Sequence, residues 1–376
     1  MKKAWYVITI LLSVLPYLLF VVAFGIYTQS RTGPNEFYLK AAIGSLIFAF
    51  VTTPFFKALR DKARNRAEYD EFGRNKKRTY QNLSRKERDQ IDLEKTKDLE
   101  RMISSTALKQ MTKKGSKNPK EDMDKLIGLS PVKQKMEEMV ARMQFDKMNK
   151  NKHVDSRHMV FYGSPGTGKT TVARILTGFL YQNGYIKKNK CIEVDGNFLK
   201  AGQKTAIKTE YIIQQAYGGV LFIDEAYALA YGKDGSGEEA IATLIKQMED
   251  NRDKFILILA GYTTEMQLLL ELNPGFKSRI KEYLMFPDYT SEELFNIFSS
   301  MAKAEGYEVH ENARKRFYER IQNEQLLDSF GNARTVRNIL DDAYDKHAYH
   351  YMNGIVGESY KMVIQNIDIP VQPRTF

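Results

Sequence analysis

The segment at positions 163–170 constrains the fold of this 376-residue chain more than any other feature. Its sequence, Gly-Ser-Pro-Gly-Thr-Gly-Lys-Thr, fits the pattern GxxxxGK[ST]. The apolar run at 159–162 directly before it is typical of a buried strand, and residues 171–181 after it have apolar residues at helical spacing. A strand, a glycine-rich loop and a helix in this order predict a P-loop in an α/β fold with a parallel sheet.

The residue types in this loop suit the binding of nucleotide phosphates. Glycines let the backbone curl so that successive N–H groups face a β-phosphate at a helix N-terminus, where the helix dipole also favours anions. Lys169 adds a positive charge for the β- and γ-phosphates, and the Thr170 hydroxyl is a ligand for Mg²⁺. We therefore expect ATP and Mg²⁺, with the nucleotide held by Gly163, Ser164, Pro165, Gly166, Thr167, Gly168, Lys169, Thr170, Thr171 and, from a later strand, Asp224.

Two adjacent acids end a second apolar run, Val-Leu-Phe-Ile-Asp-Glu at 220–225. A buried parallel strand has no structural use for two carboxylates at its carboxyl end, which is the edge where α/β sheets bind ligands. Asp224 is expected to hold Mg²⁺ together with Thr170, and Glu225 to orient and polarise the attacking water. The alternative is that Asp224 only caps the helix that follows.

Four further segments extend these two motifs along the chain. They are Leu-Ile-Gly-Leu at 126–129, Ala-Gly-Tyr at 260–262, Asn-Pro-Gly-Phe-Lys-Ser-Arg at 273–279 and Gly-Asn-Ala-Arg at 331–334. With the P-loop and the second run, they resemble the AAA+ ATPases of the CbxX/CfxQ type, which include red-type Rubisco activases, stage V sporulation protein K and type VII secretion ATPases. The resemblance covers residues 126 to 351. It implies an ATP hydrolase with a helical lid that assembles into a homo-oligomeric, hexameric ring.

The resemblance also implies roles for two arginines. Arg279 is similar to the arginine finger that reaches the γ-phosphate of a neighbouring subunit, and Arg334 is similar to sensor 2 at the start of a lid helix. A guanidinium suits both positions because it stays charged and forms a planar fork to phosphate oxygens. The alternative for each is a surface ion pair. Sensor 1 is not assigned, because no asparagine follows the strand at 256–260, and Thr263 is only a candidate.

One segment departs from the family pattern. Where the family has Asp-Leu-Val-Gly-x-Tyr-x-Gly, an aromatic loop that grips polypeptide in the pore of the ring, this chain has Asp-Gly-Asn-Phe-Leu-Lys-Ala-Gly at 195–202. Phe198 and Leu199 are the candidates to replace the usual aromatic pair, although the spacing differs. Threading of a substrate is therefore less well supported than ATP hydrolysis.

The first 56 residues contain two apolar runs, at 4–27 and 41–56. The first run has no charge between Lys3 and Arg31, and at about 1.5 Å per residue it exceeds the ~30 Å of a hydrocarbon core. The second run lengthens to start at Phe37 if the ammonium of Lys40 snorkels to the interface. Together they predict a transmembrane hairpin over residues 4–56. A cleaved signal peptide and a buried helical hairpin are the alternatives.

Basic residues flank this hairpin on one side of the membrane. Lys2 and Lys3 precede it, and five Lys or Arg residues follow it between Lys57 and Arg66. By the positive-inside rule, both ends lie in the cytoplasm. We therefore expect a multi-pass protein of a bacterial plasma membrane, with the ATPase domain in the cytoplasm.

The net charge of +11 lies entirely in the first third of the chain, because residues 126–376 carry equal numbers of basic and acidic residues. A module that binds nucleic acid usually carries the basic excess itself. Nucleic acid is therefore not expected as a partner, and a DNA motor is disfavoured. The lysine-rich stretch 57–124 is expected to be a stalk, which lies against anionic headgroups or is a solvated helical linker.

The C-terminal part has apolar residues at helical spacing over 291–305, 311–323 and 332–352. His347 and His350 lie three residues apart, but no third metal ligand accompanies them. The single cysteine, Cys191, lies in a strand-like run and is expected to be a small buried hydrophobe.

The expected domains are a transmembrane hairpin (1–56), a basic stalk (57–124), an AAA+ P-loop α/β domain (125–287) and a helical lid with a C-terminal tail (288–376). The favoured function is a membrane-anchored ATPase that couples ATP binding and hydrolysis to remodelling or disassembly of a protein partner, whose identity the sequence does not give. The alternative is a nucleotide-gated assembly or scaffold protein at the membrane, with little threading of substrate.

Overall fold

The computed structural model describes residues 103–149, 157–201, 204–231 and 235–373. The predicted hairpin at 4–56 and the stalk up to residue 102 lie outside the described residues, and so does the predicted membrane orientation that rests on them. Within the described ranges, no helix has both the length and the apolar character that a membrane span needs.

One mixed sheet forms the centre of the ATPase domain. Its strands are β1 (Thr112–Lys114), β2 (His158–Gly163), β3 (Lys190–Asp195), β4 (Val220–Asp224), β5 (Ile256–Gly261) and β6 (Ile280–Phe286). They lie in the order β1-β3-β4-β5-β2-β6. Strands β2 to β6 pair in parallel and β1 pairs antiparallel with β3. This arrangement agrees with the parallel α/β sheet expected from the sequence.

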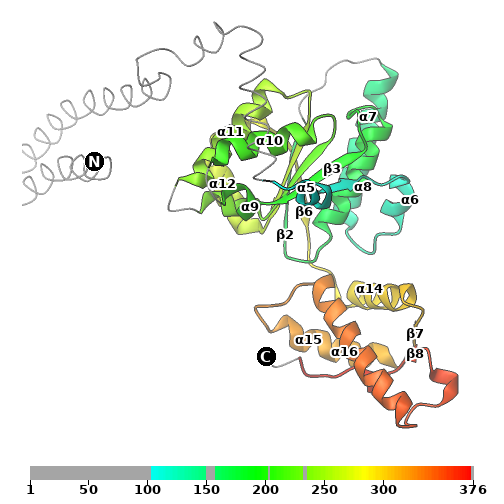
Figure 1. Ribbon diagram of the computed structural model, residues 1–376. Helices are drawn as coiled ribbons and strands as arrows, with labels where there is room; N and C mark the ends of the chain where they lie inside the picture. The colour runs from blue at the N-terminus through cyan, green and yellow to red at the C-terminus, as the bar shows by residue number, and fades with distance from the viewer. Residues whose placement is uncertain (1–102, 150–156, 202–203, 232–234, 374–376) are drawn as a thin grey trace, which may run out of the picture. The chain divides into compact units, whose positions relative to one another are not determined.

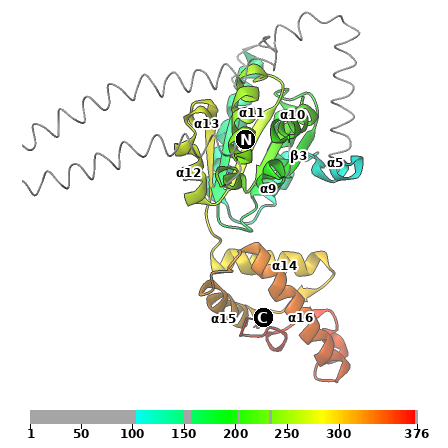
Figure 2. The same ribbon diagram turned by 60° about the vertical axis from the view of Figure 1, so that its left-hand side comes forward.

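Helices cover both faces of this sheet (Figure 1). They are α5 (Ser105–Met111), α6 (Pro119–Asp124), α7 (Ser130–Met148), α8 (Lys169–Gln182), α9 (Gly196–Lys200), α10 (Thr205–Ala216), the 3₁₀ helix η1 (Ala226–Ala230), α11 (Ser236–Asp250), α12 (Thr263–Leu272) and α13 (Pro274–Arg279). Helices α7 and α8 contribute to one buried cluster, and α10 and α11 contribute to the cluster on the other face. Figure 2 shows α12 and α13 at one edge of the sheet and α5 at the other.

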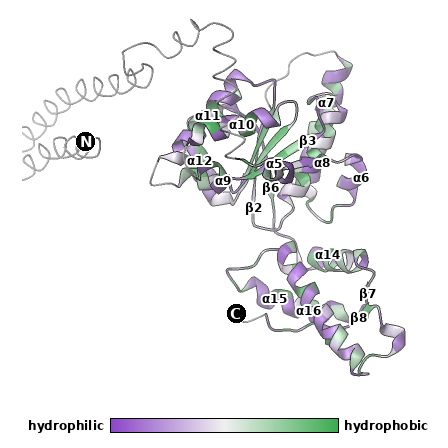
Figure 3. Cartoon of the chain, viewed as in Figure 1, coloured by the Kyte–Doolittle hydropathy of each residue, from purple (hydrophilic) through white to green (hydrophobic). Residues whose placement is uncertain are grey.

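The inner strands β2, β4 and β5 are apolar because they are covered on both faces. Figure 3 shows them as a hydrophobic centre beneath helices with more polar outer faces. All six residues of β5 are buried, as are the first four of β4. Strand β6 alternates between buried and exposed residues, as expected for an edge strand with one covered face.

Part of the segment that composition assigned to the stalk belongs to this domain. Thr112 of β1 pairs with Ile192 of β3, and Ile103 and Met123 are buried in the two clusters. A strand of three residues with two lysines has too little apolar pattern to be distinguished from a linker in the sequence. Packing of the described residues thus begins before residue 125.

The lid contains the three expected helices, α14 (Ser291–Ala304), α15 (Ala313–Gln325) and α16 (Ala333–Met352), with the short strands β7 (Glu308–Val309) and β8 (Val363–Ile364) and the 3₁₀ helices η2 (Glu358–Tyr360) and η3 (Asn366–Asp368). Thr290 and Glu293 form a capping box that begins α14. Phe295, Phe298 and Phe317 pack together between α14 and α15, with ring centroids as close as 4.9 Å.

Buried polar contacts attach the C-terminal segment to α15 and α16. Arg320 is only 1% exposed, and its guanidinium binds Glu324, Asp342 and the carbonyl oxygen of Pro370, each at 2.9 Å. A buried guanidinium with three acceptors satisfies its charge internally. The segment after β8 is therefore part of the folded lid.

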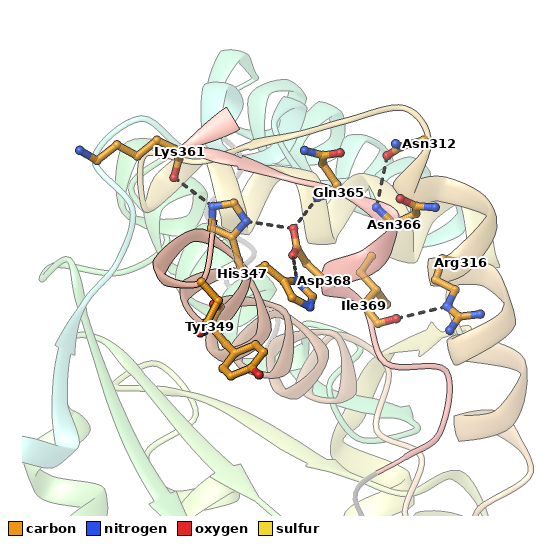
Figure 4. Close-up of polar contacts among 11 residues, drawn as sticks. Asn312, Arg316, His347, Tyr349, Lys361, Gln365, Asn366, Asp368 and Ile369 are labelled. Atoms are coloured by element: carbon orange, nitrogen blue, oxygen red, sulfur yellow. Dashed lines mark hydrogen bonds and ion pairs between the residues drawn. The ribbon is translucent and has the colours of Figure 1, made fainter. Parts of the chain in front are cut away.

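Figure 4 shows a second attachment, between α16 and η3. The Nδ1 atoms of His347 and His350 lie 2.9 and 2.7 Å from the two carboxylate oxygens of Asp368. The second ring nitrogen of His347 lies 3.0 Å from the carbonyl oxygen of Lys361. The two histidines thus belong to a hydrogen-bond network, and the described residues contain no group of three or more His, Cys, Asp or Glu side chains placed to hold a metal ion.

Candidate nucleotide-binding site

The P-loop joins β2 to α8, as the sequence motif predicts. Gly166 and Gly168 have φ angles of 69° and 92°, which lie in the left-handed region that glycine adopts without strain. Gly168 is the N-cap of α8, a helix of 14 residues. The loop therefore presents the positive end of a full helix, together with unpaired N–H groups of its first turn, to an anion.

Lys169 lies within this loop and its side chain is largely buried. Its Nζ atom donates hydrogen bonds to the carbonyl oxygens of Gly163 and Ser164, both at 2.8 Å. Burial lowers the pKa of Lys169, while the nearby Asp224 carboxylate opposes this effect. These contacts hold the ammonium at the loop, where it can bind phosphate oxygens.

The two acids after β4 have different environments. Asp224 accepts a hydrogen bond from the N–H of Glu225 at 3.0 Å, and burial raises the pKa of its carboxyl group. Glu225 has φ 47° and ψ 40°, so its backbone is left-handed although it is not glycine. Such a conformation costs on the order of 1 kcal/mol, and it ends the strand directly before η1.

The carboxyl edge of the sheet and the start of α16 enclose a cavity of about 360 Å³. It is lined by Pro165, Gly166, Thr167, Gly168, Lys169, Thr170, Thr171, Asp224, Glu225, Tyr227, Gly261, Tyr262, Met301, Ala333, Arg334 and Arg337. The structure thus brings together most of the residues that sequence analysis proposed for the nucleotide and the metal. Gly163 and Ser164 belong to the same loop and accept from Lys169.

The donor set at this cavity fits a magnesium nucleotide. A lysine ammonium and a helix N-terminus suit phosphates, whereas the Thr170 hydroxyl and the Asp224 carboxylate are oxygen ligands of the kind that Mg²⁺ prefers. The Arg334 guanidinium adds a second cation. Burial has the largest effect on the pKa values of Lys169 and Asp224, and the positive charge of Arg334 acts to lower both.

Four large side chains at the cavity were not proposed as site residues from the sequence, those of Tyr227, Tyr262, Met301 and Arg337. The rings of Tyr227 and Tyr262 stack with centroids 5.3 Å apart, and burial raises the pKa of Tyr227, with a smaller contribution from Glu225. Arg337 lies three residues after Arg334, so both project from one face of α16. The spacing of the two arginines was the available signal for Arg337. Thr263, the candidate for sensor 1, begins α12 and is not among the residues that line the cavity.

Arg279 lies away from this cavity, at the end of α13. Its guanidinium donates to the carbonyl oxygen of Gly275 at 3.1 Å and forms an ion pair with Glu249 at 3.0 Å. Burial lowers the pKa of His158, which begins β2 at the opposite end from the P-loop, and the Arg279 charge adds a smaller effect in the same direction. Within one chain, Arg279 is therefore not part of the nucleotide site.

The segment that replaces the family's pore loop forms α9. Leu199 is 0% exposed, so its proposed role as an aromatic substitute in a pore is wrong: the side chain belongs to the core. Phe198 is partly buried, and the Lys208 ammonium lies 5.1 Å from the centre of its ring. Lys200 donates to the carbonyl oxygens of Ala228 and Tyr231 at 2.8 and 2.6 Å, which ties α9 to η1.

Comparison with protein families agrees with this fold and site. Residues 159–288 match the ATPase family associated with various cellular activities (AAA), and residues 290–375 match the AAA lid domain. Protein CbbX of Cereibacter sphaeroides is 41% identical over 240 residues, which cover 61% of this chain and 77% of that protein. The chloroplastic ribulose bisphosphate carboxylase/oxygenase activase of Cyanidioschyzon merolae is 44% identical over 234 residues, covering 59% and 79%.

Among solved structures, the AAA domain of FIGL-1 has a TM-score of 0.52 at 14% identity, covering 72% of this chain and 86% of that one. This likeness concerns the fold alone. The chain belongs to the AAA ATPase family with an AAA lid domain, and its relatives are of the CbbX/CfxQ type. It is therefore an ATP hydrolase. Proteins of this family generally bind ATP with Mg²⁺ and are typically oligomeric.

Proposed function

We propose that this protein is a membrane-anchored AAA ATPase that uses ATP binding and hydrolysis to remodel or disassemble a protein partner at the cytoplasmic face of a membrane. The observation that carries this proposal is the meeting of Lys169, Asp224, Glu225 and Arg334 at one cavity. A chain that only binds nucleotide has no need for a carboxylate held in a strained backbone beside the magnesium ligand.

Each residue at the cavity has a role in this proposal. The loop N–H groups and Lys169 bind the β- and γ-phosphates, and Thr170 and Asp224 hold Mg²⁺, which when bound neutralises charge on the phosphate oxygens. Glu225 accepts a hydrogen bond from the attacking water and polarises it. Arg334 stabilises the negative charge that develops on the γ-phosphate. Thr171 continues the first turn of α8 and contributes its N–H group.

Arg279 completes the site in the neighbouring subunit of a hexameric ring. Its location outside its own cavity supports this role, because a guanidinium that acts within the same chain would have to line that chain's site. The short α13, which begins with Pro274 and packs against α11 and α12, holds Arg279 at a fixed place. ATP hydrolysis would then require contact between subunits.

The client is proposed to be a protein, and its identity is open. The name of the Cyanidioschyzon merolae relative assigns that protein to ribulose bisphosphate carboxylase/oxygenase. For the present chain the shared part is the ATPase, and relatives with the same ATPase can differ in client. A nucleotide-gated scaffold is the second candidate. The burial of Leu199 and the attachment of α9 through Lys200 favour it, because they leave this segment little freedom to grip polypeptide.

The membrane anchor is proposed from the two apolar runs within residues 4–56 and from the basic residues that follow them. The neutral charge of residues 126–376 supports a protein client over nucleic acid.

Capture of bound proteins by a Glu225→Gln chain tests the proposal. Such a variant is expected to retain ATP and to hold its client in native membranes, while the Lys169→Ala chain, which lacks nucleotide binding, releases it. If partner proteins stimulate ATP turnover of the unmodified chain, the remodelling function is supported. Nucleotide binding with negligible turnover under all conditions would favour the scaffold.

A further inference from the structure

Consecutive carbonyl groups of the P-loop accept hydrogen bonds from the lid and from the segment before it. The N–H of Ala333 donates to the Gly166 carbonyl oxygen at 3.3 Å, and the Tyr289 hydroxyl donates to that of Thr167 at 3.2 Å. In a planar trans peptide, the C=O and the next N–H point in opposite directions. These contacts therefore leave the N–H groups that follow, which include that of Gly168, directed away from the lid donors.

Asn332 makes the third contact of this kind and uses its whole side-chain amide. Its Nδ2 atom donates to the Pro165 carbonyl oxygen at 3.3 Å and to the Asp288 carboxylate at 2.9 Å, while its Oδ1 atom accepts from the N–H of Tyr289 at 3.0 Å. The residue is 0% exposed. One buried side chain thus joins the P-loop, the segment before α14 and the start of α16.

The backbone of Asn332 is also unusual. It has φ 48° and ψ −122°, a conformation that glycine adopts readily and other residues rarely adopt. It lies directly before α16, the helix that carries Arg334 and Arg337 into the cavity. The backbones approach closely here, because a Cβ on Gly166 would lie 2.1 Å from the Gly331 carbonyl oxygen. Strain that persists at such a point indicates a position that the surrounding contacts enforce.

We propose that Asn332 is a positioning residue for ATP hydrolysis: its amide locks the start of α16 to the P-loop and so holds the Arg334 guanidinium at the phosphate end of the cavity. This inference rests on the proposed function, since it acts through Arg334. Its consequence is that the P-loop and the lid change position together. The carbonyl oxygens of three successive loop residues, 165 to 167, accept hydrogen bonds from Asn332, Ala333 and Tyr289.

The first test is Asn332→Gly in the full-length chain. Glycine suits the backbone angles and removes the side chain, a methylene group and the amide that makes the three contacts. We expect kcat to fall about 10- to 100-fold, because small displacements of a positioned group have effects of this size. We also expect weaker binding of ATP, whereas the affinity for ADP, which has no γ-phosphate, changes less than about threefold. A purely structural role would lower thermal stability without this difference between ATP and ADP.

Thr335→Val is the matched control. The Thr335 hydroxyl accepts a hydrogen bond from the N–H of Gly331 at 2.9 Å, in the same turn, and the residue is also buried. Among the described residues, no hydrogen bond joins this hydroxyl to the P-loop. This variant is expected to lower the melting temperature and to leave kcat within about twofold. An equal loss of kcat in both variants would overturn the inference, because any weakening of the α16 start would then suffice.

A double-mutant cycle with Arg334→Ala separates the inference from the function on which it rests. If Asn332 acts through Arg334, the double variant is no slower than Arg334→Ala alone. If the losses of kcat in the two single variants multiply in the double variant, the inference is overturned. It is also overturned if Arg334→Ala is slow while Asn332→Gly has unchanged turnover. Full turnover of Arg334→Ala would overturn the proposed role of Arg334, and the inference with it.

A second variant keeps the test decisive if the glycine variant does not fold. Asn332→Asp preserves the volume but places a carboxylate against Asp288 and the Pro165 carbonyl oxygen. Adding Asp288→Asn restores a hydrogen bond between positions 288 and 332 and leaves the Pro165 contact broken. Recovery of stability with turnover still low supports the inference. Recovery of full turnover overturns it, since the contact with the P-loop would then be dispensable.

Discussion

Arg279 and Glu249 form a 3.0 Å ion pair within one chain, between the end of α13 and the end of α11. The Glu249 side chain is exposed, so a pair of this kind contributes only about 0–1 kcal/mol to stability. Because this ion pair is weak, breaking it costs little free energy. A nucleotide phosphate bound to a neighbouring subunit can therefore compete with Glu249 for the Arg279 guanidinium.

The first prediction concerns this arginine. An Arg279→Ala chain should bind ATP and hydrolyse it about 10³- to 10⁵-fold more slowly, the usual effect of losing an arginine finger. A Lys169→Ala chain should lack nucleotide binding but still carry an intact finger. Mixed in one ring, the two inactive chains place some intact P-loops beside intact fingers, so part of the activity should return. Turnover of labelled ATP in mixtures of the two purified chains measures this recovery.

Glu249→Gln is the control for the first prediction, because it removes the ion pair and keeps the finger. It should retain turnover within about threefold. If mixing restores nothing although mixed rings are shown to form, Arg279 is a structural arginine, and Lys277 and Arg252 are the next residues to test.

The second prediction concerns Glu225 and its strained backbone. Glu225→Gln should keep ATP binding while turnover falls on the order of 10²- to 10⁴-fold, the scale for loss of a general base. Glu239→Gln, on the exposed face of α11, is a matched control that should leave turnover unchanged. Steady-state hydrolysis and nucleotide affinity, measured on the same preparations, distinguish the roles. Unchanged turnover in the Glu225 variant would reject its assignment as the base.

Much of the ATPase domain could be predicted because its signals are local. The apolar runs at β2, β4 and β5 are uninterrupted, as strands covered on both faces must be, and the glycine and lysine of the P-loop have fixed spacing. The lid helices followed from apolar spacing in the same way. In each of these cases a short stretch of sequence determines the structure.

The features that the sequence did not predict depend on contacts between distant residues. Asn332 meets Pro165, which lies 167 positions earlier, and no local pattern marks that contact. Asp368 reaches His347 from the far side of a loop, so the pair of histidines had no visible partner in sequence. Leu199 was misread because an apolar residue in a short helix looks the same whether it faces a pore or the core, and only tertiary packing decides.

The third prediction concerns pH and the buried His158. Burial, with a contribution from the Arg279 charge, lowers the pKa of His158 from 6.5 to about 4. Because of this difference, His158 in the unfolded chain binds a proton as the pH falls below about 6.5. In the folded chain His158 binds this proton only as the pH approaches about 4. The contribution of the neutral His158 to the free energy of unfolding is complete above pH 6.5. As the pH falls to 4, the free energy of unfolding decreases by about 3 kcal/mol in total.

A His158→Asn chain isolates this effect. The Nδ1 atom of His158 accepts a hydrogen bond from the N–H of Leu257 at 3.0 Å, and an asparagine oxygen can take its place. Melting temperatures at pH 7.5, 6 and 5 should converge between the variant and the unmodified chain as the pH falls. A constant difference across this range would show that His158 does not titrate there.

The last prediction concerns the orientation of the proposed membrane hairpin, and the burial of the native cysteine simplifies its test. The native cysteine, Cys191, is 0% exposed, and burial raises the pKa of its thiol to about 12, so it should not react with a maleimide in the folded chain. A single introduced cysteine can therefore be read without background. Gly33→Cys, in the loop between the two apolar runs, should be labelled by an impermeant reagent in whole cells. Lys117→Cys should be labelled only after the membrane is permeabilised, because the proposed topology places the ATPase domain in the cytoplasm. Position 117 is chosen because the Lys117 side chain is exposed. Gly115 is unsuitable, because a Cβ there would lie 2.1 Å from Asn189. The opposite labelling pattern would place the ATPase domain outside the cell, away from ATP, and would exclude the proposed topology.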